Sequence, residues 1–302
     1  MQTEESLDMT AAQPIRRRKR ICSWTILVAQ FLLLMSIFFL TQSASAMPDD
    51  ERELRAVDAS TAKISDKIQR LSRYISAHPE SSLIIGYRAQ LYNVTTSYAE
   101  TLKDMTRYFE LKKGPHPPAI YKVRGHALLN LHRPLEALED FKTAHRISPK
   151  DGETIYLRGR ALENLDRLLD AKADYTEATS LKEYRAYLNK ASVELKLNQT
   201  HRAGRDMVSY VKHSKDIGTV VSQITNIFMT GEFKKTLILC DAFESANLHY
   251  QDIEIMRAEC LFQLGQCEEL QKEPGNNFSA SRMKRLKELK KTCKPLPQNS
   301  SR

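Results

Sequence analysis

Apolar residues between positions 118 and 183 recur every three or four residues, in two stretches that are each interrupted by a short polar turn. The first turn lies near Arg133 and the second near Arg167. Spacing of this kind places the apolar side chains on one face of a helix, so each stretch predicts two amphipathic helices. Two helices joined by a tight turn form a helical hairpin. The pattern therefore predicts two consecutive helical hairpins.

The two hairpins are copies of one another. The octet RGHALLNL at 124–131 returns almost unchanged as RGRALENL at 158–165, so the repeat distance is 34 residues (124 to 158). The same distance separates further matched pairs: Leu135 and Leu169, Ala137 and Ala171, Asp140 and Asp174, Phe141 and Tyr175, and Ala144 and Ala178. A fixed period of this size indicates a repeat protein, in which each unit packs mainly on its neighbours.

Small and aromatic residues stand at matching places in both copies. We expect each glycine to face the alanine twelve residues later, because two small side chains let antiparallel helices approach closely. The aromatic residue is then expected to fill the space toward the neighbouring hairpin. The residues assigned to this packing are Gly125, Ala137, Phe141, Gly159, Ala171 and Tyr175.

These residues and the period resemble the tetratricopeptide repeat. Its consensus contains an aromatic residue, a Leu-Gly pair and a tyrosine, followed by alanine, phenylalanine, alanine and proline. Pro149 stands where the closing proline is expected, whereas Arg124 and Arg158 replace the leucine that is usual in that family. The resemblance implies an all-α fold, a right-handed superhelical solenoid of tetratricopeptide-like helical hairpins.

Weaker copies of the pattern extend the resemblance over residues 60–272. The stretches are 62–77, 88–111, 187–203, 219–243 and a first helix that begins at Arg257. Few glycines and prolines interrupt them, ten and eleven in the whole chain. We therefore expect one continuous helical repeat domain over residues 47–274, because a solenoid has no fixed upper size.

The first 46 residues carry the signals of export. A basic run, RRRKR at 16–20, precedes an apolar run at 21–40, and Ala44 and Ala46 form an A-x-A arrangement before Met47. This order predicts a signal peptide that is cleaved after Ala46. The apolar run is also about long enough to remain as a membrane anchor with its basic end in the cytosol. Either alternative places the repeats outside the cytosol: secreted, periplasmic, in the secretory-pathway lumen, or single-pass membrane-anchored.

The basic character of the chain lies at its carboxyl end. The formal net charge is +9, and residues 275–302 contain eight basic residues and one acidic residue. Met283, Leu286 and Leu289 form an apolar stripe among them. We expect a helix that caps the exposed last repeat, followed by a tail, with contact to an anionic membrane or polysaccharide as the alternative. No aromatic residue is interleaved with the basic residues, so the sequence does not favour nucleic acid.

Four cysteines lie in the last quarter of the chain: Cys240, Cys260, Cys267 and Cys293. In an oxidising compartment an even number suggests two disulfides. Helical packing favours Cys240 with Cys260 and Cys267 with Cys293, the second pair fastening the tail to the last hairpin. The alternative is free buried thiols, because cysteine is among the most often buried residue types. Their spacing does not suggest a zinc site.

The sequence contains none of the short motifs of common enzymes. It has no glycine-rich phosphate-binding loop, no H-E-x-x-H and no G-x-S-x-G, and its eight histidines are dispersed. We therefore predict no catalytic residue, no metal and no cofactor, and we expect a protein that is not an enzyme.

The resemblance also implies a binding surface. In tetratricopeptide arrays the first helices line a concave groove that holds extended peptides or partner helices. The family's groove positions fall here on Lys122, His126, Asn130, Tyr156, Arg160, Asn164 and Arg185. This basic and polar set suits an acidic or carboxyl-terminal peptide, with an ordinary solvated face as the alternative.

The carboxylate clamp of some family members is not matched. Lys122 agrees with it and Arg185 replaces a lysine, but His126, Leu157 and Asn189 differ at the other three places. The sequence therefore predicts an exported or membrane-tethered protein-binding scaffold or adaptor. The alternative is an envelope or surface structural protein that associates with anionic lipid or polysaccharide through its basic tail.

Overall fold

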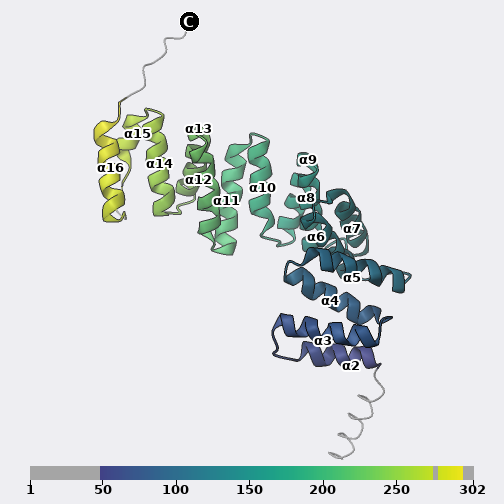
Figure 1. Ribbon diagram of the computed structural model, residues 1–302. Coiled ribbons are helices and arrows are strands. Elements are labelled where there is room, and N and C mark those ends of the chain that lie inside the picture. The colour runs from purple at the N-terminus through teal and green to yellow at the C-terminus, as the bar shows by residue number, and fades with distance from the viewer. Residues whose placement is uncertain (1–47, 275–277, 295–302) are drawn as a thin grey trace, which may run out of the picture. The chain divides into compact units, whose positions relative to one another are not determined.

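The computed structural model describes residues 48–274 and 278–294, and over these ranges the protein is all-α (Figure 1). The described residues form fifteen α-helices and no β-strand. In chain order the helices are α2 (Asp49–Asp58), α3 (Ile64–Ala77), α4 (Ser82–Val94), α5 (Tyr98–Leu111), α6 (Pro118–Asn130), α7 (Pro134–Ile147), α8 (Gly152–Asn164), α9 (Leu168–Ser180), α10 (Ala186–Lys196), α11 (Thr200–Ser214), α12 (Ile217–Met229), α13 (Phe233–Ser245), α14 (Gln251–Gln263), α15 (Cys267–Lys272) and α16 (Ala280–Thr292).

The predicted helical array is present. The two strong hairpins are α6–α7 and α8–α9, and the weaker copies correspond to α3, α4–α5, α10–α11, α12–α13 and α14. Helix α2 was not predicted. The predicted signal peptide or anchor lies outside the described residues, and none of the described helices is both long and apolar enough to cross a membrane. The handedness of the solenoid stays a prediction.

The chain divides into two compact units, residues 1–87 and 88–302. In the first unit, α2 and α3 bury Val57 and Leu71. The second unit contains both strong repeats. The division falls inside α4 and not at the predicted limits of the repeat domain, which stay predictions.

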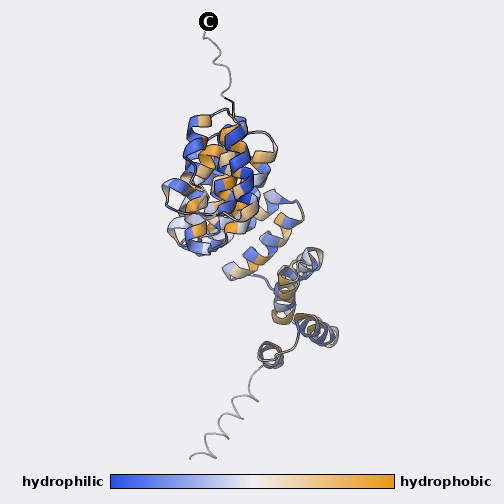
Figure 2. Cartoon of the chain, turned by 90° about the vertical axis from the view of Figure 1, so that its left-hand side faces the viewer, coloured by the Kyte–Doolittle hydropathy of each residue, from blue (hydrophilic) through white to orange (hydrophobic). Residues whose placement is uncertain are grey.

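Successive helices of the second unit pack as hairpins, α6 on α7, α8 on α9 and α10 on α11, and α7 and α9 also pack on the helix that follows them (Figure 1). The apolar residues of α6 to α9 form one core cluster, in which Phe141, Ile155 and Tyr175 are among the largest fully buried side chains. Figure 2 shows apolar and polar residues mixed along individual helices, as expected for helices that bury one face.

The turn inside successive hairpins has the same backbone geometry. One residue adopts the left-handed conformation, with φ of 58° at His132 and 56° at both Asp166 and Asn198. The next amide then bonds back to the end of the first helix, as Arg133 N–H does to the carbonyl oxygen of Leu128 at 2.9 Å. Such a turn ends one helix and reverses the chain within three residues, so the second helix can pack on the first.

The glycine of each strong repeat makes room for the aromatic ring of its own hairpin. That Gly125 also faces Ala137 stays a prediction. A Cβ atom at Gly125 would lie 2.7 Å from the ring of Phe141, and one at Gly159 would lie 2.8 Å from the ring of Tyr175. These distances are shorter than real carbon contacts, so the rings lie where any larger residue would stand. Each aromatic residue therefore packs against the glycine of its own hairpin, whereas we expected it to fill the space toward the neighbouring hairpin.

An ion pair ties the two helices together in three successive hairpins, at a constant sequence separation of 16 residues. The pairs are Arg88 with Asp104, Arg124 with Asp140, and Arg158 with Asp174. Each guanidinium makes two N–H···O bonds of 2.6 to 2.8 Å. This fork explains the arginine in place of the consensus leucine, because its guanidinium satisfies a buried carboxylate of the second helix.

The basic helix α16 packs on the last repeat. Its Leu286 and Leu289 are buried in one apolar cluster with Leu261 of α14. Arg285 forms two bonds to Glu259, of 2.6 and 3.0 Å. Half of the basic residues of α16 are thus used within the chain itself.

The cysteines behave in two ways. Cys267 and Cys293 form a disulfide, with their Cα atoms 5.7 Å apart, which joins α15 to the residue after α16. The predicted bridge between Cys240 and Cys260 is not formed, and both are free and buried. Burial raises the pKa of both thiols, that of Cys260 to about 12. They are therefore protonated at neutral pH and act as small apolar side chains.

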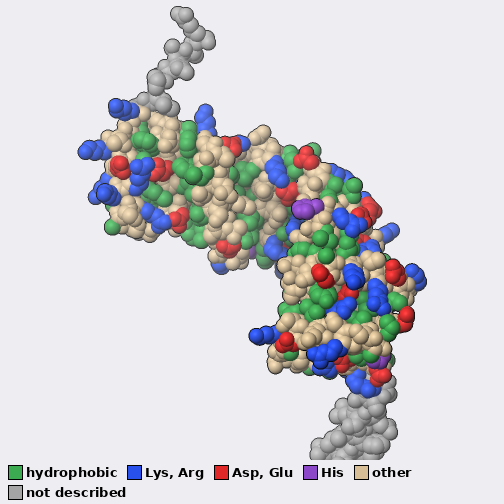
Figure 3. Space-filling model, viewed as in Figure 1, with side chains coloured by type: hydrophobic (Ala, Val, Ile, Leu, Met, Phe, Trp, Pro, Cys, Tyr) green, Lys and Arg blue, Asp and Glu red, His purple; other side chains and the backbone are tan. Residues whose placement is uncertain are grey.

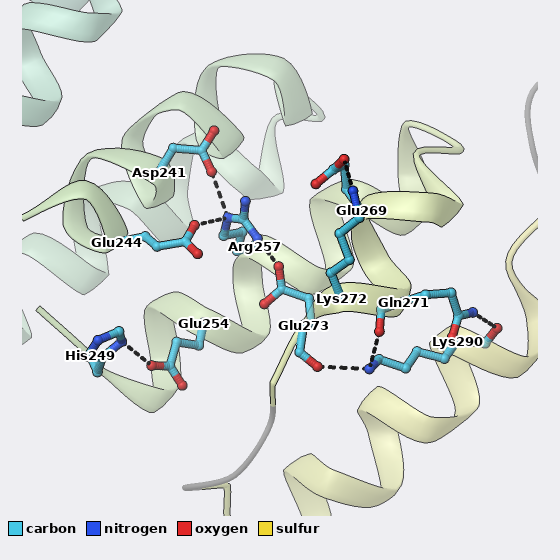
Figure 4. A network of polar contacts seen from close by, with 10 residues as sticks. All are labelled: Asp241, Glu244, His249, Glu254, Arg257, Glu269, Gln271, Lys272, Glu273 and Lys290. Atoms are coloured by element: carbon cyan, nitrogen blue, oxygen red, sulfur yellow. Dashed lines mark hydrogen bonds and ion pairs between the residues drawn. The ribbon is translucent and has the colours of Figure 1, made fainter. Parts of the chain in front are cut away.

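Arg257 of α14 connects the last helices (Figure 4). Its Nε atom lies 2.6 Å from Asp241 and 3.0 Å from Glu244, and its Nη1 atom contacts Glu273. Lys290 of α16 donates to the carbonyl oxygen of Glu273 at 2.8 Å. These contacts link α13, α14 and α16 through one polar network.

Candidate partner-binding face

The seven residues predicted to line a groove lie on three successive first helices. Lys122, His126 and Asn130 belong to α6, Tyr156, Arg160 and Asn164 belong to α8, and Arg185 immediately precedes α10. Residues four positions apart lie on the same side of a helix, so each helix presents a short row. These seven residues are called the first-helix face below.

Two cations of this face are already paired with carboxylates of the chain. Lys122 Nζ lies 2.6 Å from Glu153 and 3.0 Å from Asp151. Arg185 binds Glu183 at 2.8 Å and approaches Glu153 at 3.7 Å. Burial lowers the pKa of Lys122, but the hydrogen bonds to its two carboxylates outweigh that effect and raise it. An incoming acidic group would have to displace these partners, which the sequence reasoning did not identify.

Tyr156 connects α8 to the next first helix. Its hydroxyl group donates to Asn189 Oδ1 of α10 at 3.3 Å. The guanidinium carbon of Arg185 lies 5.1 Å from the centre of its ring, within the range of a cation–π contact. Burial raises the pKa of Tyr156. The residue therefore supplies a neutral, largely buried ring between α8 and α10.

His126 connects α6 to the preceding first helix. Its Nδ1 atom lies 2.9 Å from Asn93 Oδ1 of α4, and Asn130 Nδ2 donates to the carbonyl oxygen of His126 at 2.8 Å. Because Asn93 Oδ1 is an acceptor, this contact assigns the proton to Nδ1. Burial, and then the charge of Arg160, lower the pKa of His126, so the ring is neutral at pH 7.

Arg160 differs from the other two cations. It is half-buried, and within the described part of the chain its guanidinium makes no ion pair and no hydrogen bond. Asn164 donates to its carbonyl oxygen at 2.9 Å and not to its side chain. Its charge lowers the pKa of His126, and it opposes the effect of burial on Tyr156. Arg160 is therefore a cation of this face that has no paired carboxylate in the described residues.

The chemistry that this face can perform is recognition. Among residues 48–274 and 278–294, no group of three or more His, Cys, Asp or Glu side chains is arranged to hold a metal ion. The face combines one unpaired guanidinium with a neutral imidazole, a tyrosine ring and amides. Such a set can bind a carboxylate by charge-assisted hydrogen bonds.

Comparisons with known proteins agree with the repeat. Residues 152–183, which contain α8 and α9, match the tetratricopeptide repeat family model. A tetratricopeptide repeat protein from Parabacteroides merdae ATCC 43184 is similar in structure, with a TM-score of 0.50 and 16% identity over 80% of this chain and 96% of that chain. No curated protein matches this chain in sequence.

Two further solved structures are similar at lower scores. MamA from Desulfovibrio magneticus RS-1 has a TM-score of 0.49 and 13% identity over 57% of this chain and 99% of that chain. PilW, a widely conserved type IV pilus biogenesis factor, has a TM-score of 0.47 and 18% identity over 68% of this chain and 98% of that chain.

The family match at α8–α9, the 34-residue period and the helical hairpins confirm the resemblance stated from the sequence. The chain therefore contains tetratricopeptide repeats, with the family model matched at residues 152–183. Proteins of this family are typically scaffolds without enzymatic activity.

Proposed function

We propose that this protein is a non-enzymatic interaction scaffold that holds an acidic segment of a protein partner against the first-helix face. The observation that carries the proposal is Arg160, a half-buried guanidinium without an anionic partner in the described residues. Lys122 and Arg185, on the same face, are neutralised by Glu153 and its neighbours. The carboxylate for Arg160 is supplied by the partner.

The physical basis is the difference between an unpaired and a paired cation. A guanidinium that is partly removed from water gains more from a carboxylate than an exposed one, because the surrounding dielectric is lower. The neutral His126 and Tyr156 add hydrogen-bonding groups without opposing charge. An extended acidic peptide or a partner helix with one acidic stripe satisfies this arrangement.

We also propose that the scaffold works outside the cytosol, exported or tethered by residues 1–46. The support is the order of basic, apolar and small residues in that segment. A disulfide between Cys267 and Cys293 is compatible with an oxidising compartment.

The test is a titration of the full chain with a fluorescein-labelled peptide of alternating glutamate and glycine. We expect Arg160→Glu to weaken binding by at least about tenfold, or about 1.4 kcal/mol. The control is Arg205→Glu, because Arg205 is an exposed arginine of α11 without an ion pair in the described residues. An Arg160 variant that binds as tightly as the Arg205 variant would remove the proposal.

A second candidate function rests on the outer side of α16. Lys284, Lys287 and Lys291 are exposed, share one side of the helix by their spacing, and make no ion pair in the described residues. Figure 3 shows several Lys and Arg side chains around the α16 end of the face in view. Unimpaired peptide binding by Arg160→Glu, together with loss of binding to phosphatidylserine vesicles when all three lysines are changed to glutamate, would favour a lipid-associated surface protein.

A further inference from the structure

The hairpin α10–α11 contains an acidic residue where the other hairpins are apolar. Each first helix carries the cation of the ion pair that ties its hairpin together. Four residues after this cation stand Leu128 in α6 and Leu162 in α8, but Glu194 in α10. Glu194 is 1% exposed. A carboxylate in a fully buried position is costly unless its oxygens are satisfied.

The ion pair between the two helices is also weaker in this hairpin. Lys190 replaces arginine, and its Nζ atom lies 3.2 and 3.5 Å from the two oxygens of Asp206, 16 residues further on. A lysine is a point charge and cannot make the two parallel bonds of a guanidinium. Glu194 Oε2 is buried without a hydrogen-bond partner in the described residues, and Asp206 Oδ2, although 3.2 Å from Lys190 Nζ, is not aligned with it for a hydrogen bond. Two orphaned carboxylate oxygens, which accept no hydrogen bond, therefore lie in one hairpin.

Glu194 lies one helical turn after Lys190 on α10, and Lys190 contacts Asp206, so the two carboxyl groups share one neighbour. Asp206 acts on Glu194 through its charge and a side-chain hydrogen bond. The charged groups that face them come from three helices: Lys172 of α9, 3.5 Å from Glu194, Lys190 of α10, and the carboxylates themselves. Lys172 is shared, because it also donates to Gln199. The two lysines balance the two acids in number but leave one oxygen of each acid without an aligned hydrogen-bond donor.

We propose that Glu194 and Asp206 bind one shared proton, and that loss of this proton loosens the α10–α11 hairpin and with it the first-helix face. With the proton bound, the Glu194 hydroxyl group donates to Asp206 and both orphaned oxygens are satisfied. Without the proton, two buried carboxylates face one another. The first step stands on the hairpin alone, and only its effect on the partner rests on the proposed function.

The sign of the pH dependence follows from the direction of the shift. Burial, and then the charge and hydrogen bond of Asp206, raise the pKa of Glu194 to about 7, against the lowering effect of Lys190 and Lys172. The folded hairpin therefore holds a proton that the unfolded chain has already lost. Its stability is greatest below the ordinary glutamate range and falls as the pH rises toward 7, and it levels off above that value.

The same helix carries contacts of the first-helix face. Asn189 of α10, which accepts the hydrogen bond of Tyr156, precedes Glu194 by five residues, and Arg185 lies just before the helix. A change in how α10 sits on α11 therefore alters the groups beside Tyr156. We expect partner binding to be stronger at pH 6 than at pH 8.

The test is hydrogen exchange of the full chain at pH 6 and pH 8, corrected for the intrinsic effect of pH on amide exchange. With the pKa of Glu194 at about 7, linkage predicts that opening of α10–α11 increases about tenfold between these values. Glu194→Gln, which keeps the hydrogen-bond donor without titrating, should abolish this increase. Glu139→Gln, at an exposed acid of α7, is the matched control and should retain it.

A wild-type hairpin whose protection does not change between pH 6 and pH 8 would overturn the proposal, as would a Glu194→Gln chain with the wild-type change. If Glu194→Gln does not fold, carbon-13 NMR titration of the wild-type glutamate carboxyl groups decides: a buried group titrating near pH 7 supports the proposal, and ordinary glutamate values throughout refute it. Failure of Arg160→Glu to affect peptide binding refutes only the proposed function, because exchange in α10–α11 is measured without a ligand.

Discussion

The hairpins α8–α9 and α10–α11 occupy successive places in one stack but solve the same packing problem with different residues. Five buried or half-buried positions correspond at a separation of 32 residues. In α8–α9 they hold Arg158, Gly159, Leu162, Asp174 and Tyr175, and in α10–α11 they hold Lys190, Ala191, Glu194, Asp206 and Met207.

The apolar exchanges between the two hairpins compensate one another. Gly159 leaves space that the ring of Tyr175 fills, whereas the corresponding Ala191 and the slimmer, more flexible Met207 are both buried in one apolar cluster. Both pairs are well buried. A smaller residue beside a larger one is exchanged for a larger residue beside a smaller one, so the summed side-chain volume of the pair is about conserved. The lesson is that the unit of packing in this repeat is the pair, and not the glycine alone.

The polar exchanges do not compensate. Arg158 satisfies both oxygens of Asp174, but Lys190 leaves one oxygen of Asp206 without a hydrogen bond, and Glu194 adds a second acid to the hairpin. A matched core therefore carries an unmatched polar cluster in α10–α11. We therefore expect the stability of α10–α11 to depend on pH more than that of α8–α9.

The largest difference in stability between the two hairpins is expected when the aspartate of the interhelical ion pair is removed. Asp174→Ala leaves Arg158, which is 17% exposed, without its partner and should lower the free energy of unfolding by about 3 kcal/mol. At pH 8, where Glu194 is ionised, Asp206→Ala should cost less than about 1 kcal/mol, because Lys190 can turn to Glu194 and the two acids no longer repel. Urea denaturation followed by circular dichroism measures both, and equal losses would contradict the comparison.

The next effect tests the paired packing. Gly159→Ala places a methyl group against the ring of Tyr175, whose hydroxyl group is held by Glu163 at 2.8 Å, so the ring cannot easily withdraw. We expect a loss of about 2 kcal/mol from overpacking. The double change Gly159→Ala with Tyr175→Met copies the α10–α11 pair and should recover at least half of that loss. A double variant as unstable as the sum of the single ones would show that the two residues do not act as a pair.

Most of the helical array could be predicted from the sequence, because periodicity and the 34-residue offset depend on side chains that repeat. The same information did not predict that the ring of Phe141 lies against Gly125. Spacing identified two small residues, but it could not tell that the ring of Phe141 turns back into its own hairpin. That choice depends on rotamers and on the crossing of the helices, which a linear pattern does not contain.

The candidate site was predicted less completely, for an electrostatic reason. The consensus positions selected Lys122, Arg160 and Arg185 as three equivalent cations, but only the fold reveals that Glu153 lies close to two of them. The repeated ion pairs did leave a signal in the sequence, since Asp140 and Asp174 each follow an arginine by 16 residues. Pairing charged residues across the repeat would have found those ion pairs, and would have singled out Glu194 as an acid at a leucine position.

The smallest expected effect is a gain in stability. It tests whether the weak ion pair of Lys190 with Asp206 causes the difference between the two hairpins. Lys190→Arg restores the guanidinium fork, which can donate to both oxygens of Asp206 as Arg158 does to Asp174, and should raise the free energy of unfolding by about 1 kcal/mol at pH 8. Because Asp206 is then satisfied without the proton of Glu194, the pH dependence should shrink as well. The control is Lys196→Arg, at a half-exposed lysine paired with Glu163, which should change stability by less than about 0.5 kcal/mol. A Lys190→Arg chain that gains stability but keeps the full pH dependence would mean that Glu194 alone, and not the replaced arginine, sets this hairpin apart.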